Sequence, residues 1–216
     1  MKYFTHSQIT IDNFDPENIS KLYSQGFKFT RIARGVLQST RNLRVDLSKF
    51  KLSSENRRIL RKNSELTMEI FDLPYVNYDY KIAKLCKDFY TQKFNDKIFS
   101  AMKVRDMFQG LLNMNAVAVY KIGTEAVGYC LLYKNAEIVH YCYPFYELKF
   151  VNSSLGIGMM TTLIEYAFQN KMKFVYLGGC NKPSDLYKLQ FNGVEWWDET
   201  SLFWSVDIKK LKLEVE

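Results

Sequence analysis

A glycine-rich turn, Ser154-Leu155-Gly156-Ile157-Gly158-Met159, precedes an apolar stretch that we expect to be a helix ending near Gln169. The first N–H groups of a helix have no partner within it and carry a partial positive charge. Gly156 and Gly158 lack a Cβ atom, so a phosphate or an oxyanion can approach the backbone closely there. The turn is therefore a candidate donor-binding site, although a Gly-x-Gly pair can equally serve a tight turn alone. The candidate residues are Ser154, Leu155, Gly156, Ile157, Gly158 and Met159, with Gly178 after the next strand.

A run of cations is the second group of residues whose types suggest a chemical role. A helix expected to begin at Ser53 or Ser54 carries the cations Arg57, Arg58, Arg61 and Lys62. They form two pairs four residues apart, so each pair lies along one face of the helix. Two such rows fit a phosphate backbone, which they would contact without reading base sequence. A solvated helix face is the alternative. Together with Arg44 on the preceding strand, these residues are the candidate nucleic-acid contacts.

The strands and helices expected around these groups indicate a mixed sheet. Strands are expected at 116–122, 126–133, 137–142 and 174–177. Pro144 is expected to end the third strand, so that residues 145–152 form a loop before the glycine turn. Antiparallel strands followed by a strand–helix–strand unit are similar to the sheet of GNAT-like acyltransferases, whose two central strands separate beside an activated acyl donor. We therefore expect an α/β (α+β) protein with a GNAT-like acyltransferase fold, in which helices flank a central mixed sheet.

The N-terminal part predicts a smaller arrangement of helix and strands. Asp15-Pro16-Glu17 can begin a helix that ends at Gly26. Further strands are expected at 27–32, 43–47 and 66–71, and amphipathic helices at 78–94 and 104–112. We expect residues 1–71 to form a small N-terminal αβ subregion and residues 72–216 to form the transferase domain.

Several motifs resemble those of the aminoacyl-tRNA–protein transferases, the arginyl and bacterial leucyl enzymes of the N-degron pathway. The stretch Asn56-Arg57-Arg58-Ile59-Leu60-Arg61-Lys62-Asn63 is similar to the family's Gln-Arg-Arg-x-Leu-Arg-Arg-Asn, and the preceding residues 44–53 also agree. Further matches follow in family order: Ser154-Leu155-Gly156, Tyr176-Leu177-Gly178, and Tyr187-Lys188 with Phe191. The resemblance covers about Leu22 to Glu195. It implies an aminoacyltransferase that moves an amino acid from aminoacyl-tRNA to a protein N-terminal amine.

The sequence departs from that family in two places. Val36-Leu37-Gln38-Ser39-Thr40-Arg41 stands where the family's cysteine motif would lie, so no metal or cluster is expected. Gly156-Ile157-Gly158 is closer to the Gly-x-Gly of coenzyme-A-binding acetyltransferases. Two alternatives therefore stay open: an acetyl-CoA-dependent N-acyltransferase of the GNAT superfamily, and a non-catalytic relative that binds RNA or protein.

The chemistry that the resemblance implies is acyl transfer to an amine. An aminoacyl ester is already activated, so the amine can attack it directly, without a covalent enzyme intermediate. A peptide α-amine has a pKa of about 7.7–8, so a base need give only modest help. Tyr187 can hydrogen-bond the acyl oxygen, Lys188 can meet a phosphate or an acidic substrate side chain, and Asp185 can anchor the amine. His140 can accept the amine proton; the alternative is a packed strand histidine that a neighbour satisfies.

Bulk properties limit the remaining choices. The 216 residues suffice for one domain with a full core, or for one domain with a small extension. The four cysteines lack C-x-x-C spacing, which indicates free thiols in a reducing cytoplasm. No apolar run reaches the length of a membrane span, and the N-terminus lacks the apolar core of a signal peptide. We expect a cytoplasmic monomer without a bound cofactor, with tRNA and a protein or peptide N-terminus as partners. Aminoacyl-tRNA is the expected co-substrate and acetyl-CoA the alternative.

Overall fold

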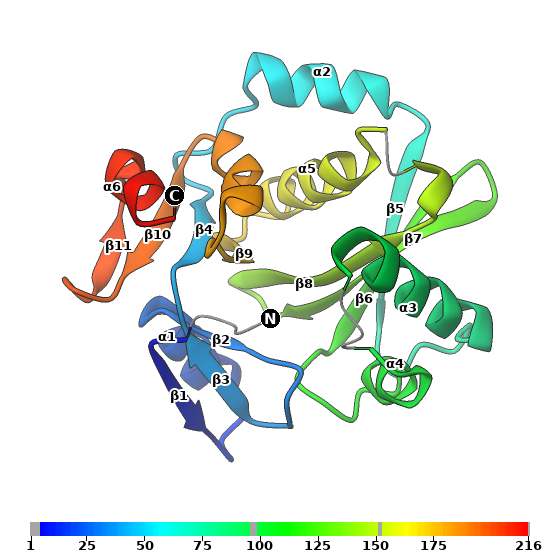
Figure 1. The fold of residues 1–216 in the computed structure, drawn as a ribbon, viewed down its shortest axis with the longest axis horizontal. Coiled ribbons are helices and arrows are strands. Elements are labelled where there is room, and N and C mark those ends of the chain that lie inside the picture. Colours follow the sequence, from blue (N-terminus) through cyan, green and yellow to red (C-terminus); the bar gives the residue numbers. More distant parts are fainter. Residues whose placement is uncertain (1–4, 96–98, 151–152, 216) are drawn as a thin grey trace. The chain divides into compact units, whose positions relative to one another are not determined.

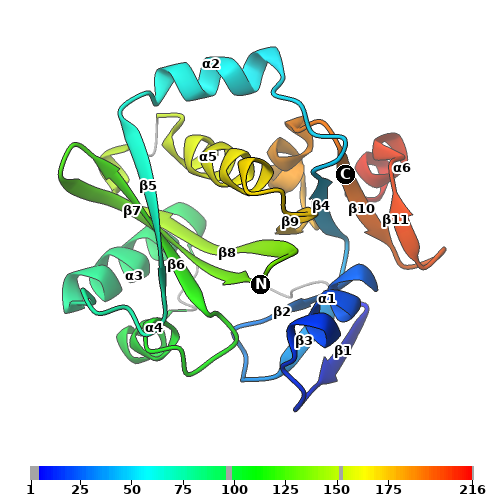
Figure 2. The same cartoon turned by 180° about the vertical axis from the view of Figure 1, so that it is seen from behind.

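The computed structural model describes residues 5–95, 99–150 and 153–215 (Figure 1, Figure 2). Two units can be distinguished, each built from separate stretches of the chain. The first unit consists of residue 1 and residues 54–133 and 141–166. The second unit consists of residues 2–53, 134–140 and 167–216. The stretch expected as an N-terminal subregion, residues 1–71, thus contributes to both units. A domain division at residue 71 stays a prediction.

The first unit contains an antiparallel sheet. Its strands are β5 (Leu66–Asp72), β6 (Ala116–Ile122), β7 (Glu125–Lys134) and the later part of β8 (Ile138–Tyr146). β6 pairs antiparallel with both β5 and β7. The helices are α2 (Ser54–Lys62), α3 (Tyr80–Phe94), α4 (Ala101–Phe108) and most of α5 (Leu155–Gln169), with a 3-10 turn η1 (Leu148–Phe150). α3 begins where the Asp79 carboxylate accepts the N–H groups of Lys81 and Ile82, as an N-cap does.

The second unit contains a small sheet and part of a large one. The small sheet has the order β1 (Ser7–Thr10), β3 (Val36–Ser39), β2 (Phe27–Phe29), all antiparallel. The part of the large sheet in this unit comprises β11 (Phe203–Ser205), β10 (Val194–Asp198), β4 (Asn42–Asp46), β9 (Phe174–Gly179) and the start of β8, in that order. The helices are α1 (Pro16–Ser24), the 3-10 helix η2 (Pro183–Gln190) and α6 (Ile208–Val215).

Strand β8 belongs to both units, and the large sheet therefore has the order β11-β10-β4-β9-β8-β7-β6-β5. β9 runs parallel to the start of β8, with Ile138 opposite Phe174 and His140 opposite Tyr176. The expectation that strand 174–177 lies beside strand 137–142 is confirmed. So is the fold class, a mixed sheet with flanking helices.

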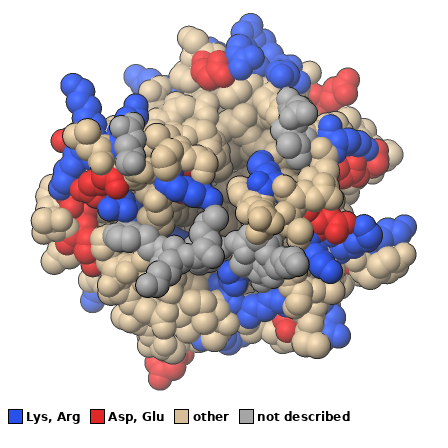
Figure 3. Space-filling view, viewed as in Figure 1, with Lys and Arg blue, Asp and Glu red and all other residues tan. Residues whose placement is uncertain are grey.

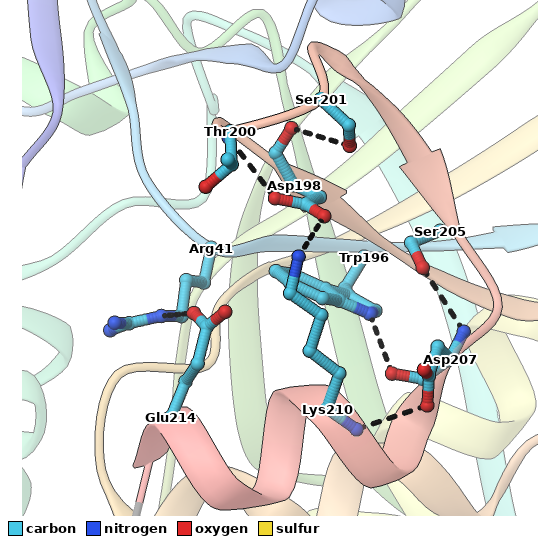
Figure 4. A network of polar contacts seen from close by, with 9 residues as sticks. All are labelled: Arg41, Trp196, Asp198, Thr200, Ser201, Ser205, Asp207, Lys210 and Glu214. Carbon is cyan, nitrogen blue, oxygen red and sulfur yellow. Dashed lines mark hydrogen bonds and ion pairs between the residues drawn. The ribbon is translucent and has the colours of Figure 1, made fainter.

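Polar contacts hold α6 against β10 in the second unit (Figure 4). The Lys210 ammonium contacts the Asp198 carboxylate, and the Trp196 indole N–H donates to the Asp207 carbonyl at 3.0 Å. Arg41 Nε pairs with Glu214 of α6 at 2.8 Å. Leu211 of α6 and Trp196 are both buried, so these contacts close over apolar packing.

The prediction that Pro144 ends a strand is wrong, because β8 continues to Tyr146. A proline removes only one N–H donor from a strand, and the Pro144 carbonyl still accepts the Tyr90 hydroxyl at 3.1 Å. The aromatic residues Phe145 and Tyr146, which follow it, favour an extended chain and are buried. Of the expected loop at 145–152, Leu148–Phe150 forms η1, and residues 151–152 lie outside the described residues. The expected strand 27–32 is also shorter, since β2 ends at Phe29.

Candidate functional site

The glycine turn is the first turn of helix α5, which begins at Leu155. The Leu155 N–H donates to Ser153 Oγ at 3.1 Å, and the Gly158 N–H donates to the Ser154 carbonyl at 2.8 Å. Met159, one residue further on, has its N–H in the regular helical pattern. The Gly158 and Met159 N–H groups are thus used within the helix, and donor binding at the turn stays a prediction. Gly156 and Ile157 are left as the first-turn donors without a partner within the helix.

Both glycines of the turn are explained by close packing within the first unit. A Cβ at Gly158 would lie 2.8 Å from Cγ of Asn63, and a Cβ at Gly156 would lie 3.0 Å from the Tyr146 ring. Contacts this short would force the neighbouring side chains to move. The Tyr146 hydroxyl is itself held by Lys93 Nζ, which donates to it at 2.6 Å. The space that the glycines leave is thus filled by side chains of this chain.

Asn63 joins the basic helix to the glycine turn. It directly follows α2, and its Nδ2 donates to the Ile59 carbonyl in the last turn of that helix at 2.9 Å. The same Nδ2 lies 3.5 Å from Ser154 Oγ, and the amide rests against Gly158. In Figures 1 and 2 the end of α2 accordingly lies beside the start of α5. Two motifs that are far apart in the sequence therefore meet in one unit.

The cations of α2 are exposed, as the phosphate-binding hypothesis requires. They are Arg57, Arg58, Arg61 and Lys62. Figure 3 shows Lys and Arg side chains gathered at the top of the view, where Figure 1 places α2. Arg58 forms a two-bond ion pair with Glu55, at 2.7 Å for both nitrogens. With Glu55 counted, four cations and one anion leave the helix with three net positive charges.

Arg44 has a different environment, which does not favour the predicted tRNA contact. Its Nε and one terminal nitrogen both contact Glu195 Oε2, at 2.9 and 2.8 Å. The guanidinium lies 4.0 Å from the ring centroid of Phe174 and 4.2 Å from that of Trp204. Only 12% of the Arg44 side chain and 6% of the Glu195 side chain are exposed. Arg44 is therefore part of a buried ion pair rather than of a surface for phosphates.

His140 is buried in the second unit and lies 2.9 Å, Nδ1 to Oη, from the hydroxyl of Tyr23. The same hydroxyl accepts the Phe29 N–H at 3.1 Å. This arrangement favours a Tyr23 hydroxyl that donates to Nδ1, and the neutral ring then carries its proton on Nε2. Burial, reinforced by the charges of Lys28 and Lys188, holds the pKa of His140 well below its usual value. These features favour the packed histidine over a group that accepts the amine proton.

Asp185 and Lys188 lie together after the end of β9. Lys188 Nζ donates to the Gly179 carbonyl at 2.8 Å and is 3.5 Å from Asp185 Oδ1. The other Asp185 oxygen accepts the Asn181 N–H at 3.1 Å. Both side chains therefore shape the chain after the strand, and in this arrangement Asp185 already has a cationic partner. Tyr187, on the same 3-10 helix, is 49% exposed and stays a candidate for contact with substrate.

Gly178 has a backbone that only glycine adopts readily, with φ at +79°. A Cβ there would have no atom within 4 Å, so the space beside this residue is open within its unit. Cys180, two residues on, is buried, and burial raises the pKa of its thiol to about 11 despite the opposing charge of Lys188. A thiol with this pKa is largely protonated at neutral pH and is a poor nucleophile.

Two residues that contact or support the glycine turn were missed in the sequence: Asn63 and Lys93. Asn63 closes the Arg-rich motif, which was the available signal, but its contact with the glycine turn depends on residues about ninety positions away. Lys93 carried no motif, and Tyr146, which it contacts, was expected in a loop before the glycine turn. Of the expected site residues, the first unit brings the α2 cations near the glycine turn. The second unit brings Asp185 and Lys188 together after β9.

No protein-family model matches the chain, and no curated protein sequence matches it. Solved structures do match. The C-terminal domain (DUF2156) of an Agrobacterium fabrum protein described as a candidate lysylphosphatidylglycerol synthetase is 12% identical, with a TM-score of 0.52 over 76% of this chain and 52% of that one. L-PGS from Bacillus licheniformis is 15% identical, with a TM-score of 0.49 over 80% and 53%. A GCN5-related N-acetyltransferase region of a fungal multi-domain enzyme is 9% identical, with a TM-score of 0.48 over 88% and 23%.

This chain thus spans about half the length of the first two structures. Within the part of the chain that the structure describes, no helix is both long and apolar enough to cross a membrane, and no three His, Cys, Asp or Glu side chains gather as metal ligands would. The strand order shows a mixed sheet flanked by helices, and the Agrobacterium domain has a similar fold.

Proposed function

We propose that this chain is an aminoacyltransferase that moves an amino acid from aminoacyl-tRNA to the N-terminal amine of a protein or peptide. The proposal rests on the contact between the basic helix α2 and the glycine turn at the start of α5. Asn63 directly follows the exposed cations of α2, and its side-chain amide contacts Ser154 and Gly158 at the start of α5. A phosphate backbone held along α2 would therefore lead to the N-terminus of a helix that favours negative charge.

The reaction needs few groups. The amine nitrogen attacks the ester carbonyl, an amide C–N bond forms, and the ester C–O bond breaks. The ribose hydroxyl of the tRNA leaves with a proton that the amine has lost. The N–H groups of Gly156 and Ile157 are the proposed donors to a phosphate or to the developing oxyanion. Tyr187 is the proposed partner for the acyl oxygen or the leaving hydroxyl, and Lys188 keeps the backbone after β9 in place.

The kind of enzyme from which the Agrobacterium domain comes supports this class of chemistry. A lysylphosphatidylglycerol synthetase makes a product that carries a lysyl group, so the name describes aminoacyl transfer on a similar fold. The N-degron acceptor rests on the sequence resemblance alone. A cytoplasmic protein without a bound cofactor, acting as a monomer, is part of the same proposal.

Acetyl-CoA as donor is the competing proposal, and it rests on Gly156-x-Gly158. Because Tyr146 and Asn63 fill the space beside these glycines, packing within the protein explains the pair without a coenzyme. Acetyl transfer is therefore an outcome to be tested rather than the leading proposal.

The salt dependence of tRNA binding tests whether the cations of α2 contact the phosphates of tRNA. Phosphate contacts release counterions, so log affinity should fall linearly with log salt, by about 0.9 per duplex phosphate contacted. Arg57→Ala with Arg61→Ala should weaken binding and flatten that slope by about one to two units. The matched control is Lys209→Ala with Lys212→Ala, which removes the same charge from exposed positions of α6. Equal losses in the two double variants would show a general charge effect and contradict a contact through α2.

A further inference from the structure

We infer that Asn63 is a positioning residue that sets the geometry between the tRNA-binding helix and the donor turn. The inference rests on the proposed function and deepens it. Asn63 would not bind the donor through its charge, since it has none. It would fix where the bound donor lies relative to the reacting end of α5.

The amide of Asn63 is held on two sides. On one side its Nδ2 donates to the Ile59 carbonyl at 2.9 Å, and the same carbonyl also accepts the backbone N–H of Asn63 at 3.0 Å. On the other side a Cβ at Gly158 would be 2.8 Å from Cγ, 2.9 Å from Nδ2 and 3.1 Å from Oδ1. The whole amide plane therefore packs against the α-carbon of Gly158. Neither helix can slide without disturbing this contact.

Few side chains could replace this amide. Alanine would remove the side-chain bond to the Ile59 carbonyl, leaving only the backbone bond, and would open a gap beside Gly158. Aspartate would keep the volume but place a carboxylate against the Ile59 carbonyl, at a helix terminus that disfavours negative charge. The same packing accounts for the absence of a side chain at position 158. Residues 63 and 158 thus act as one steric pair.

A positioning role predicts that binding and transfer separate. The cations of α2 remain in an Asn63 variant, so the affinity for tRNA and its salt slope should stay near those of the wild type. The transfer step depends on alignment to within about 1 Å, and such a misplacement can cost on the order of a hundredfold in rate. The expected signature is thus a lower kcat for transfer with an unchanged Kd for tRNA.

Thermal unfolding tests whether residues 63 and 158 form a steric pair, and it needs no activity assay. With Asn63 present, Gly158→Ala should lower Tm, because its Cβ displaces the amide. In an Asn63→Ala background the same substitution should raise Tm by about 2–4 °C, since alanine is favoured over glycine in a helix and the clash is gone. If Gly158→Ala shifted Tm in the same direction and by the same amount in both backgrounds, the steric pair would be overturned.

Single-turnover transfer tests the positioning role, with Asn192→Ala as the matched control. Asn192 Nδ2 also donates to a backbone carbonyl, that of Lys51 at 2.8 Å, but lies in the other unit. Asn63→Ala and Asn63→Asp should slow transfer from bound aminoacyl-tRNA by about 10- to 100-fold while Kd stays within about twofold. Wild-type rates in these variants, an equal loss in Asn192→Ala, or a loss of tRNA affinity that matches the loss of rate would each overturn the inference and leave the proposed function standing. A wild-type protein that transfers nothing from any aminoacyl-tRNA would instead overturn the proposed function itself.

Discussion

Replacement of Arg44 by alanine should strongly destabilise the protein, because Arg44 neutralises a buried carboxylate. Its guanidinium contacts Glu195 through two nitrogens and lies between the rings of Phe174 and Trp204. Removal of one partner of a buried ion pair costs about 3–5 kcal/mol in free energy of unfolding. Lys49, at 2.8 Å from Glu195 Oε1, would remain and favours the lower end of that range. Loss of two ring contacts adds about 0.5–1 kcal/mol each.

The expected total is about 4 kcal/mol, which corresponds to a fall in Tm of about 8–16 °C for a chain of this size. Urea unfolding measures it directly, and the slope of the free energy with urea should not change. Arg61→Ala, an exposed arginine, serves as control and should shift stability by less than about 0.5 kcal/mol. A cost below about 1 kcal/mol for Arg44→Ala would refute the buried-pair account.

Three further predictions concern the pH response, the region after β9 and a helix cap. Because burial lowers the pKa of His140, the unfolded chain binds a proton there that the folded protein does not, so stability should fall as pH drops below about 6.5, by at most about 1.4 kcal/mol per pH unit. His140→Asn should reduce this slope, as unfolding measured at several pH values can check. Tyr187→Phe should slow peptide modification with little change in Tm. Lys188→Met should lower both the rate of peptide modification and Tm, because Lys188 also donates to the Gly179 carbonyl. Asp79→Ala should lower the free energy of unfolding by about 1 kcal/mol, since it removes the cap of α3; an unchanged urea midpoint would contradict that role.

The order of strands and helices in the centre of the chain was predictable because local patterns decide it. The helix after the glycine turn was expected to end near Gln169 and does. Strand β9 begins at Phe174 as expected, and its apolar run reflects burial on both faces. Pro144 misled the prediction because a single missing donor does not end a strand whose next residues, Phe145 and Tyr146, are buried aromatics.

The fate of the charged residues was less predictable, because a sequence does not show which cation has a partner. Arg44 lies between Leu43 and Val45 in the sequence and Arg57 between Asn56 and Arg58, and neither setting identifies an ion-pair partner. Arg44 is largely covered and pairs with Glu195, about 150 positions away, whereas Arg57 is exposed on α2. The two glycines of the turn are a similar case. Their meaning depends on Asn63 and Tyr146, which come from other parts of the chain.

Mass spectrometry of an acceptor peptide tests the central claim most directly. Purified protein would be incubated with a panel of peptides that differ at the first residue, and with either a set of charged aminoacyl-tRNAs or acetyl-CoA. The account predicts that a peptide gains one amino-acid residue on its N-terminal amine, only with aminoacyl-tRNA present, and more slowly with the Arg57→Ala, Arg61→Ala double variant. Peptides that gain an acetyl group from acetyl-CoA, and no residue from any aminoacyl-tRNA, would contradict the account.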